Sequence, residues 1–176
     1  MFYLFLADGF EETEALAPLD MMRRAKIEVK TVGVTGEFVT GSHGVTVKAD
    51  LKPEEISFNN IDGVVLPGGM PGTVNLGKSE TVTKAAVYCA ENGKITAAIC
   101  AAPSVLGNLG ILKGKKATCF PGFEKELEGA TYTAAPVEID GNVITGKGAG
   151  CAILFGKAIV EKAVSAEAAN KVCGDM

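Results

Sequence analysis

The chain has 176 residues, 47% of them hydrophobic, and its 17 basic and 21 acidic side chains give a net charge of −4. This length and composition predict one domain over residues 1–176, and the acidic balance argues against specific nucleic-acid binding. No apolar run approaches the roughly 18 residues that a membrane helix needs, and the first segment lacks the basic leader of a signal peptide. We therefore expect a cytoplasmic protein without a membrane partner.

The cysteines are five in number, irregularly spaced and without a C-x-x-C pair, and the chain has a single histidine. Free thiols in a reducing compartment are the simplest interpretation, and the pattern offers little for a zinc site. We expect no metal and no cofactor. The five are Cys89, Cys100, Cys119, Cys151 and Cys173.

Patterns typical of strands and of helices alternate along the chain. Strand patterns cover residues 2–7, 26–34, 61–69, 94–100 and 115–120, with hairpins at 37–49 and 137–145. Helical patterns cover residues 12–25, 79–93, 102–110 and 150–164, and a last helix follows Ser165. Near-continuous apolar strands separated by helices predict an α/β three-layer sandwich, a mostly parallel sheet with helices on both faces. Ligands bind such sheets outside the carboxyl ends of the strands.

The segment AICAA places Cys100 between a predicted buried strand and a predicted helix. A nucleophile on so sharp a turn needs small residues two positions before and after it, and Ala98 and Ala102 meet that need. The nearby helix amino terminus would favour a thiolate, which is the reactive form. The alternative is that Cys100 packs as a small hydrophobic residue, and the residues alone leave both interpretations open.

The segment LPGG ends the preceding predicted strand. Its Gly68 and Gly69 permit a tight turn that exposes backbone N–H groups, as an oxyanion hole requires, and the N–H of Ala101 would be the natural companion. Gly-Gly turns are common, so an ordinary loop is the alternative.

The segment GFEETE brings three carboxylates into the start of the first helix. Glu11 and Glu12 fit the acids expected on an exposed first turn, whereas Glu14 lies on another face and could enter the cleft. A charged Glu14 would raise the pKa of a neighbouring thiol, and a protonated one would lower it by donating a hydrogen bond to the sulfur. From the residues alone, a solvated surface charge is the simpler interpretation of Glu14.

The segments ADGFEETEA, IDGVVLPGG and AAICAAPSVLG, in this order and spacing, resemble the ThiJ/PfpI superfamily, in the branch of DJ-one and YajL-like proteins. The segments MMRRAKIEV and TGKGAGCAILFGKAIVE are similar to that branch as well, so the likeness covers about residues 2–165. The resemblance implies a flavodoxin-like α/β sandwich, usually as a homodimer.

The resemblance also implies roles for particular residues. Cys100 falls on the family's reactive, readily oxidised cysteine, and Glu14 on a protonated acid that hydrogen-bonds it. Gly69 and Ala101 fall on the donors of the oxyanion site. Arg24 and the turn at His43 fall near positions that approach the cysteine pocket across the dimer interface.

One position departs from several family members. Where they place a histidine before a proline, opposite the cysteine, this chain has Phe120. An in-chain Cys-His dyad at that place is therefore excluded, and Ala101 replaces the histidine that follows the cysteine in PfpI-type proteases. His43 could substitute only from a partner subunit, and a solvated residue at a hairpin tip is the alternative.

The resemblance implies a cysteine-dependent, cofactor-free glyoxalase or deglycase acting on methylglyoxal, glyoxal or their early adducts with proteins and nucleotides. A redox-sensing stress protein or holdase-type chaperone, whose cysteine is oxidised instead of catalytic, is the alternative. Amidotransferase-like hydrolysis would need a histidine beside the elbow, and the sequence argues against it.

Overall fold

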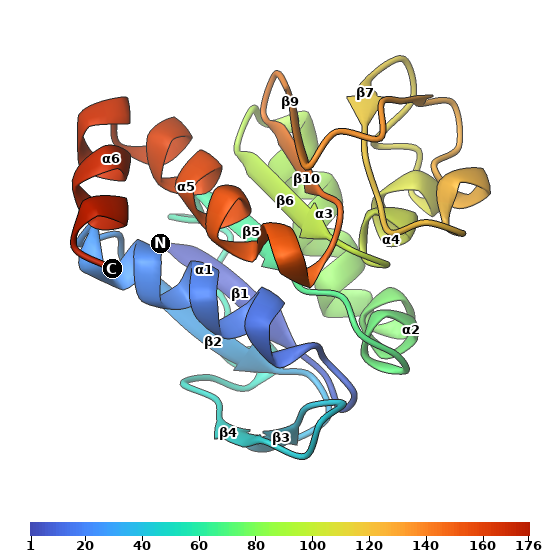
Figure 1. Cartoon of the computed structure of the whole chain (residues 1–176). Helices are drawn as coiled ribbons and strands as arrows, with labels where there is room; N and C mark the ends of the chain where they lie inside the picture. Colours follow the sequence, from blue (N-terminus) through green and yellow to red (C-terminus); the bar gives the residue numbers. More distant parts are fainter.

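The computed structural model describes residues 1–176 and is built around one six-stranded sheet (Figure 1). Its strand order is β2-β1-β5-β6-β10-β9, parallel except for the edge strand β9. The strands are β1 (Phe2–Leu6), β2 (Val29–Gly33), β5 (Gly63–Leu66), β6 (Ile95–Ile99), β9 (Val137–Asp140) and β10 (Val143–Gly146). The mostly parallel sheet predicted from the apolar runs is thereby confirmed.

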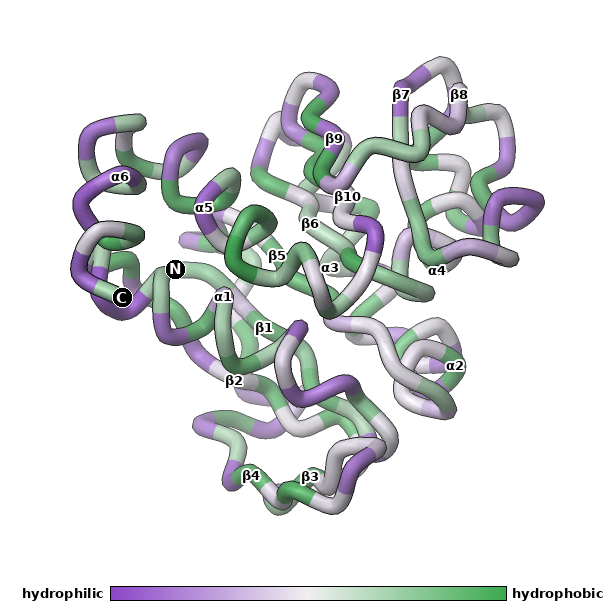
Figure 2. Tube along the Cα trace, in the orientation of Figure 1, coloured by the Kyte–Doolittle hydropathy of each residue, from purple (hydrophilic) through white to green (hydrophobic).

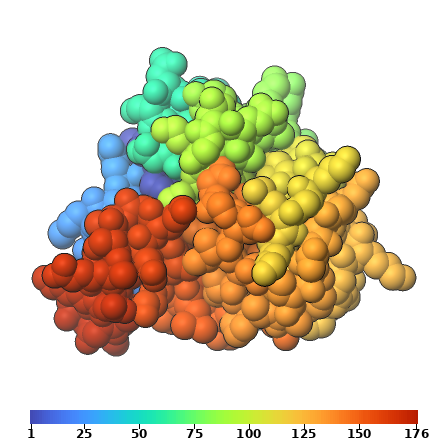
Figure 3. Space-filling view, turned by 90° about the horizontal axis from the view of Figure 1, so that it is seen from above, coloured from blue at the N-terminus to red at the C-terminus, as the bar shows by residue number.

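Helices cover both faces of this sheet, which confirms the three-layer sandwich. One layer contains α1 (Glu12–Arg24), α5 (Ala152–Ala163) and α6 (Ala166–Gly174). The other contains α2 (Gly72–Lys78), α3 (Glu80–Glu91) and α4 (Pro103–Asn108). Seen from above in Figure 3, the C-terminal helices in red and orange lie on one side and the green segment of α3 on the opposite side.

The strands are buried on both sides because they separate two hydrophobic cores. Along β1, Leu4 and Leu6 pack into the core under α1 and α5, whereas Tyr3 and Phe5 pack into the core under α3. Side chains on a strand alternate between its faces, so a strand between two layers must be apolar at every position. Figure 2 shows this as hydrophobic colouring along β1, β5 and β6.

Smaller elements surround the sheet. The hairpin predicted over residues 37–49 forms from β3 (Phe38–Thr40) and β4 (Thr46–Lys48), and Ser79 and Ser165 are the N-caps of α3 and α6. Three short 3-10 helices are η1 (Pro53–Glu55), η2 (Glu124–Glu126) and η3 (Ala149–Cys151). None of the helices combines the length and apolar character required to span a membrane.

The prediction of a strand over residues 115–120 was wrong in extent and in place. Only β7 (Lys116–Ala117) forms, and it pairs with β8 (Thr131–Tyr132) in a separate two-stranded sheet. The place beside β6 is taken by β10, whose Thr145 hydroxyl accepts the Thr118 N–H at 2.9 Å. Cys119 therefore does not lie at the carboxyl end of a strand of the main sheet, where the predicted strand over residues 115–120 would have placed it.

The helix α2 was not predicted. It begins three residues after Gly69 and contains only seven residues, among them Gly72 and Gly77. A short segment with two glycines gives no helical periodicity to detect, and it is stabilised by packing against α3 and α4.

Candidate active site

Cys100 lies at the carboxyl end of β6, on the turn that leads into α4. Its φ is +65°, in the left-handed region that residues with a side chain rarely adopt. Its N–H donates to the Gly146 carbonyl at 2.9 Å, and its carbonyl accepts the Phe120 N–H at 2.8 Å. Strained backbone of this kind is retained where the surroundings fix it, and it concentrates at active sites. The sharp turn expected from AICAA is present.

The Gly68–Gly69 turn lies against this elbow. A Cβ on Gly68 would lie 2.6 Å from the Cys100 Cβ and 2.6 Å from the Glu14 Oε2 atom. Gly68 thus occupies the space between the two side chains, and only glycine lets them approach. Gly69 has a φ of +89°, so a side chain there would strain the backbone as well.

Glu14 is completely buried in the first turn of α1. Its Oε2 accepts the Gly68 N–H at 3.0 Å, while its Oε1 is buried without a hydrogen-bond partner. Burial raises the pKa of Glu14 to about 7, although interaction with the Cys100 thiol and the Gly68 N–H opposes that rise. Near neutral pH the carboxyl group therefore exchanges a proton readily, and a solvated surface position, the simpler interpretation of the sequence, is wrong.

The thiol of Cys100 is only partly exposed. Burial raises its pKa to about 12, the negative charge of Glu14 adds to that rise, and the Ala101 and Gly69 N–H groups oppose it. A thiolate favoured by the helix terminus alone is therefore not what the structure supports, because burial and the carboxylate outweigh the two N–H groups. Protonation of Glu14 removes the opposing charge, so a thiolate at Cys100 requires the proton on Glu14, and near neutral pH the two groups together carry at most one negative charge.

The two donors expected for an oxyanion site lie on the same side of the elbow as the sulfur. The Gly69 and Ala101 N–H groups both interact with Cys100. Neither donates to a backbone carbonyl. Ser104, which the sequence did not single out, donates its hydroxyl to the Ala101 carbonyl at 2.6 Å and so holds the peptide that follows the Ala101 N–H. Its spacing is the signal in the sequence, because a serine three residues after Ala101 can reach the Ala101 carbonyl at the start of a helix.

The other two acids of GFEETE have structural roles. Glu11 is the N-cap of α1, and its Oε2 accepts the Glu14 N–H at 2.7 Å. Glu12 is nearly buried, which corrects the expectation of an exposed acid. Its Oε1 accepts the His43 N–H at 2.7 Å, and its Oε2 lies 2.8 Å from the His43 Nδ1 atom. Glu12 thereby ties the β3–β4 turn to the start of α1.

Three further predicted residues make no side-chain contact with the sulfur: His43 and Arg24 bind other residues, and Phe120 contacts the elbow through its backbone N–H. His43 is exposed at the hairpin tip, as its solvated alternative predicted, and the hydrogen bond to Glu12 raises its pKa. Arg24 lies ten residues beyond Glu14 on α1 and pairs with Asp20 at 2.7 Å. Phe120 is 47% exposed, and its ring faces Gly148. The cross-interface roles of Arg24 and His43 stay predictions.

The remaining cysteines differ from Cys100 in their surroundings. Cys89 and Cys119 are completely buried, and burial raises the pKa of the first to about 12 and of the second to about 11. Cys151 and Cys173 are partly exposed at the ends of helices, and all five thiols are free. Among these thiols only Cys100 lies on a strained turn beside a buried carboxyl group.

Comparisons with known proteins agree with this fold. The model of the DJ-1/PfpI family matches residues 2–162. The chain is 35% identical over 174 residues to the Protein DJ-1 homolog B of Arabidopsis thaliana, covering 97% of this chain and 40% of that protein. It is 36% identical over 144 residues to Deglycase TK1284 of Thermococcus kodakarensis, covering 80% and 86% of the two chains.

Among solved structures, oxidized Toxoplasma gondii DJ-1 matches with a TM-score of 0.95 and 32% identity, over 99% of this chain and 96% of that one. The chain spans about two fifths of the length of the A. thaliana relative. The family model nevertheless covers nearly the whole chain. On these grounds the chain belongs to the DJ-1/PfpI family.

Proposed function

We propose that the chain is a cysteine-dependent enzyme that converts methylglyoxal or glyoxal to hydroxy acids and removes their early adducts from amines and thiols. The observation that carries the proposal is the position of Cys100 beside the buried Glu14 carboxyl group and beside two N–H groups, those of Gly69 and Ala101, that donate to no backbone carbonyl. Relatives named deglycases, such as TK1284, support the substrate class.

The first step uses the pair as it stands. With the proton on Glu14, the Cys100 thiolate attacks the aldehyde carbon of methylglyoxal, and an S–C bond forms. The aldehyde oxygen becomes an alkoxide, which the N–H groups of Gly69 and Ala101 stabilise and which takes the proton from Glu14. The product is a neutral hemithioacetal beside a carboxylate.

The second step moves one proton between the two carbons. The Glu14 carboxylate removes the C1 proton to give an enediolate, the C1 hydroxyl proton passes to the C2 oxygen, and Glu14 returns its proton to C2, which leaves a lactoyl thioester on Cys100. Water then hydrolyses the thioester, releasing lactate and restoring the thiol. The net reaction is methylglyoxal plus water to lactate and a proton, and it needs no oxidant or reductant.

An amine adduct enters the same route. The adduct carbon of a methylglyoxal aminocarbinol bears a hydroxyl and an amine, and replacement of the amine by the Cys100 sulfur gives the same hemithioacetal. The departing amine takes up a proton, and Glu14 is the nearest group that can supply it. The proposed substrates are therefore small dicarbonyls and glycated amines.

The test is lactate formation from methylglyoxal by the wild type and by Cys100→Ser. We expect the substitution to abolish turnover because serine has no accessible alkoxide at neutral pH. Cys173→Ser is the matched control, since that partly exposed thiol lies near the end of α6, and it should keep full activity. Turnover that survives in Cys100→Ser would remove the proposal.

A second candidate function is redox sensing with holdase-type stress protection. It is favoured by the position of Cys100, which is partly exposed and lies on a strained turn beside Glu14, whereas Cys89 and Cys119 are buried. Peroxide would oxidise the Cys100 sulfur to a sulfenic acid and be reduced to water. Stoichiometric oxidation without dicarbonyl turnover would favour this function over the enzyme. For either function we propose a cytoplasmic homodimer.

A further inference from the structure

A groove of about 420 Å³ lies beside the elbow, on the face of the sheet opposite α1. Its walls are α2 and α4, and the segment around η2 closes one side. We name it the α2–α4 groove and define it by Met70, Val74, Gly77, Val105, Phe123 and Glu126. Its volume falls within the range of sites for small organic groups.

The groove begins next to the two oxyanion donors, Gly69 and Ala101. Met70 directly follows Gly69, and Ser104, which also lines the groove, holds the Ala101 carbonyl at 2.6 Å. Both turns at Cys100 therefore lead directly into residues that line the groove, so the groove lies next to a substrate bound at Cys100. Free methylglyoxal has three carbons and cannot occupy both places, whereas a peptide that carries an adduct can.

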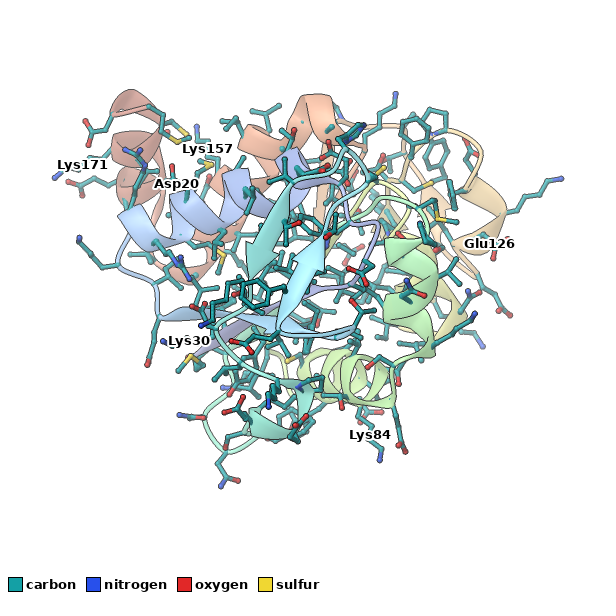
Figure 4. All side chains as sticks on the ribbon, turned by 90° about the horizontal axis from the view of Figure 1, so that it is seen from below. Asp20, Lys30, Lys84, Glu126, Lys157 and Lys171 are labelled. Atoms are coloured by element: carbon teal, nitrogen blue, oxygen red, sulfur yellow. The ribbon has the colours of Figure 1, made fainter.

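The lining combines apolar side chains with four neutral polar ones and one charge. Met70 is 51% exposed and Val74 is 40% exposed, so the groove presents apolar surface to solvent. Glu126 is the only charged residue that lines it, and no lysine, arginine or histidine does. Figure 4 shows Glu126 at the edge of the molecule, on the segment beside the light green α2.

This chemistry fits an aliphatic chain that ends in a positive charge. The methylene groups of a lysine or arginine side chain cover apolar surface while their charged end stays in water, near an acid such as Glu126. An acidic side chain would be repelled by the carboxylate of Glu126 and would find no positive charge in the groove. We propose that the α2–α4 groove binds a lysine or arginine side chain next to the modified residue of a glycated peptide. This proposal rests on the proposed function, because it assigns part of that substrate.

Two dipeptides test the proposal kinetically. In alanyl-trimethyllysine and alanyl-norleucine only the terminal amine reacts with methylglyoxal, and the first keeps a permanent positive charge. We expect the wild type to release the free amine of the charged dipeptide with a kcat/KM about three-fold higher, the size of a rim ion pair. Glu126→Gln should remove this preference, and Glu128→Gln, an exposed acid outside the groove, should keep it.

A second variant tests the shape of the groove. A Cβ on Gly77 would meet only the Val105 Cγ2 atom at 3.6 Å, so α2 accommodates a side chain there. Gly77→Leu should fill the groove and lower the ratio of dipeptide-adduct turnover to methylglyoxal turnover at least five-fold, whereas Gly77→Ala should change it less. Equal turnover of the two dipeptides by wild type and Glu126→Gln, or an unchanged ratio in Gly77→Leu, would overturn the proposal.

A binding measurement separates this proposal from the proposed function. Nα-acetyl-lysine methylamide is titrated into the whole chain with the valine methyl groups labelled for NMR. Shifts confined to Val74 and Val105, weakened by Glu126→Gln and abolished by Gly77→Leu, would support the groove even if no dicarbonyl turned over. Dicarbonyl turnover without such shifts would reject the groove and leave the enzyme standing.

Discussion

The Gly68 N–H donates to the Glu14 Oε2 atom at 3.0 Å and brings the first turn of α1 to the edge of β5. This bond satisfies one carboxyl oxygen and leaves the other, Oε1, buried and unpaired. A buried carboxylate oxygen without a hydrogen-bond partner favours the protonated acid, because the neutral form costs less to bury than the charged one. The arrangement explains why Glu14 keeps its proton to about pH 7.

The pH dependence of Cys100 alkylation should show two steps. The pair loses its first proton near pH 7, where Glu14 titrates. A fixed fraction of the resulting anion has its charge on sulfur, so the alkylation rate should be constant above pH 7 until the second proton is lost. A second rise should follow at high pH, because burial raises the pKa of the thiol to about 12. Rates resolved for each cysteine by mass spectrometry check this.

Glu14→Gln is the control for that profile. Without the carboxyl proton the first step should vanish, and dicarbonyl turnover should fall at least about 100-fold, the usual loss for a general acid–base group. A single ionisation near 8.5, as in an unperturbed thiol, in both the wild type and the variant would contradict the shared-proton pair.

Stability should fall as the pH rises through the titration of Glu14. The folded pKa of about 7 lies above the reference value of 4.5, so the folded state binds the proton more tightly and its advantage is lost between these values. The shift corresponds to at most about 3 kcal/mol. The difference in unfolding free energy between wild type and Glu14→Gln should change by this amount from pH 4.5 to 7.5. A pH-independent difference would contradict the raised pKa.

Gly68→Ala should remove activity and destabilise the fold. The new methyl group would overlap the Cys100 Cβ and the Glu14 Oε2 atom, each 2.6 Å away, so the pair must separate. We expect a loss of about 2 kcal/mol in unfolding free energy, typical of overpacking in a core. Gly150→Ala is the matched control, since no atom lies within 4 Å of its added Cβ. Equal thermal stabilities of the two variants would count against the tight contact at Gly68.

Glu12→Ala should loosen the β3–β4 hairpin. The substitution removes the carboxylate that accepts the His43 N–H at 2.7 Å and contacts its ring. Hydrogen bonds to charged groups contribute roughly 1.5–3 kcal/mol, and we expect a loss in that range by chemical denaturation. Faster amide exchange confined to residues 40–46 would locate the effect.

The exposed pair of Glu80 and Lys84 provides the comparison for that prediction. Its charged atoms lie 2.8 Å apart on the surface of α3, where such pairs contribute little. Glu80→Ala should therefore leave the free energy of unfolding nearly unchanged. Losses of the same size in both variants would show that Glu12 is not an anchor.

The sequence by itself determined the layers and the elbow. Apolar residues at every position of β1 require burial on both faces, and small residues around Cys100 permit a sharp turn at the end of β6. These features depend on local periodicity and on steric limits of the backbone, which a single chain displays directly. The resemblance to a known family then indicated that Glu14 belongs beside Cys100.

Only the tertiary structure decided which acid is buried and what it does to the thiol. Glu11, Glu12 and Glu14 are equally acidic in sequence, but one caps α1, one holds the hairpin and one faces Cys100, because α1 presents each to a different neighbour. The tertiary structure also decided that residues 115–120 do not join the main sheet, because β10, from a later part of the chain, pairs with β6. Burial and pairing arise from segments distant in sequence, and they set the charge of the pair through desolvation.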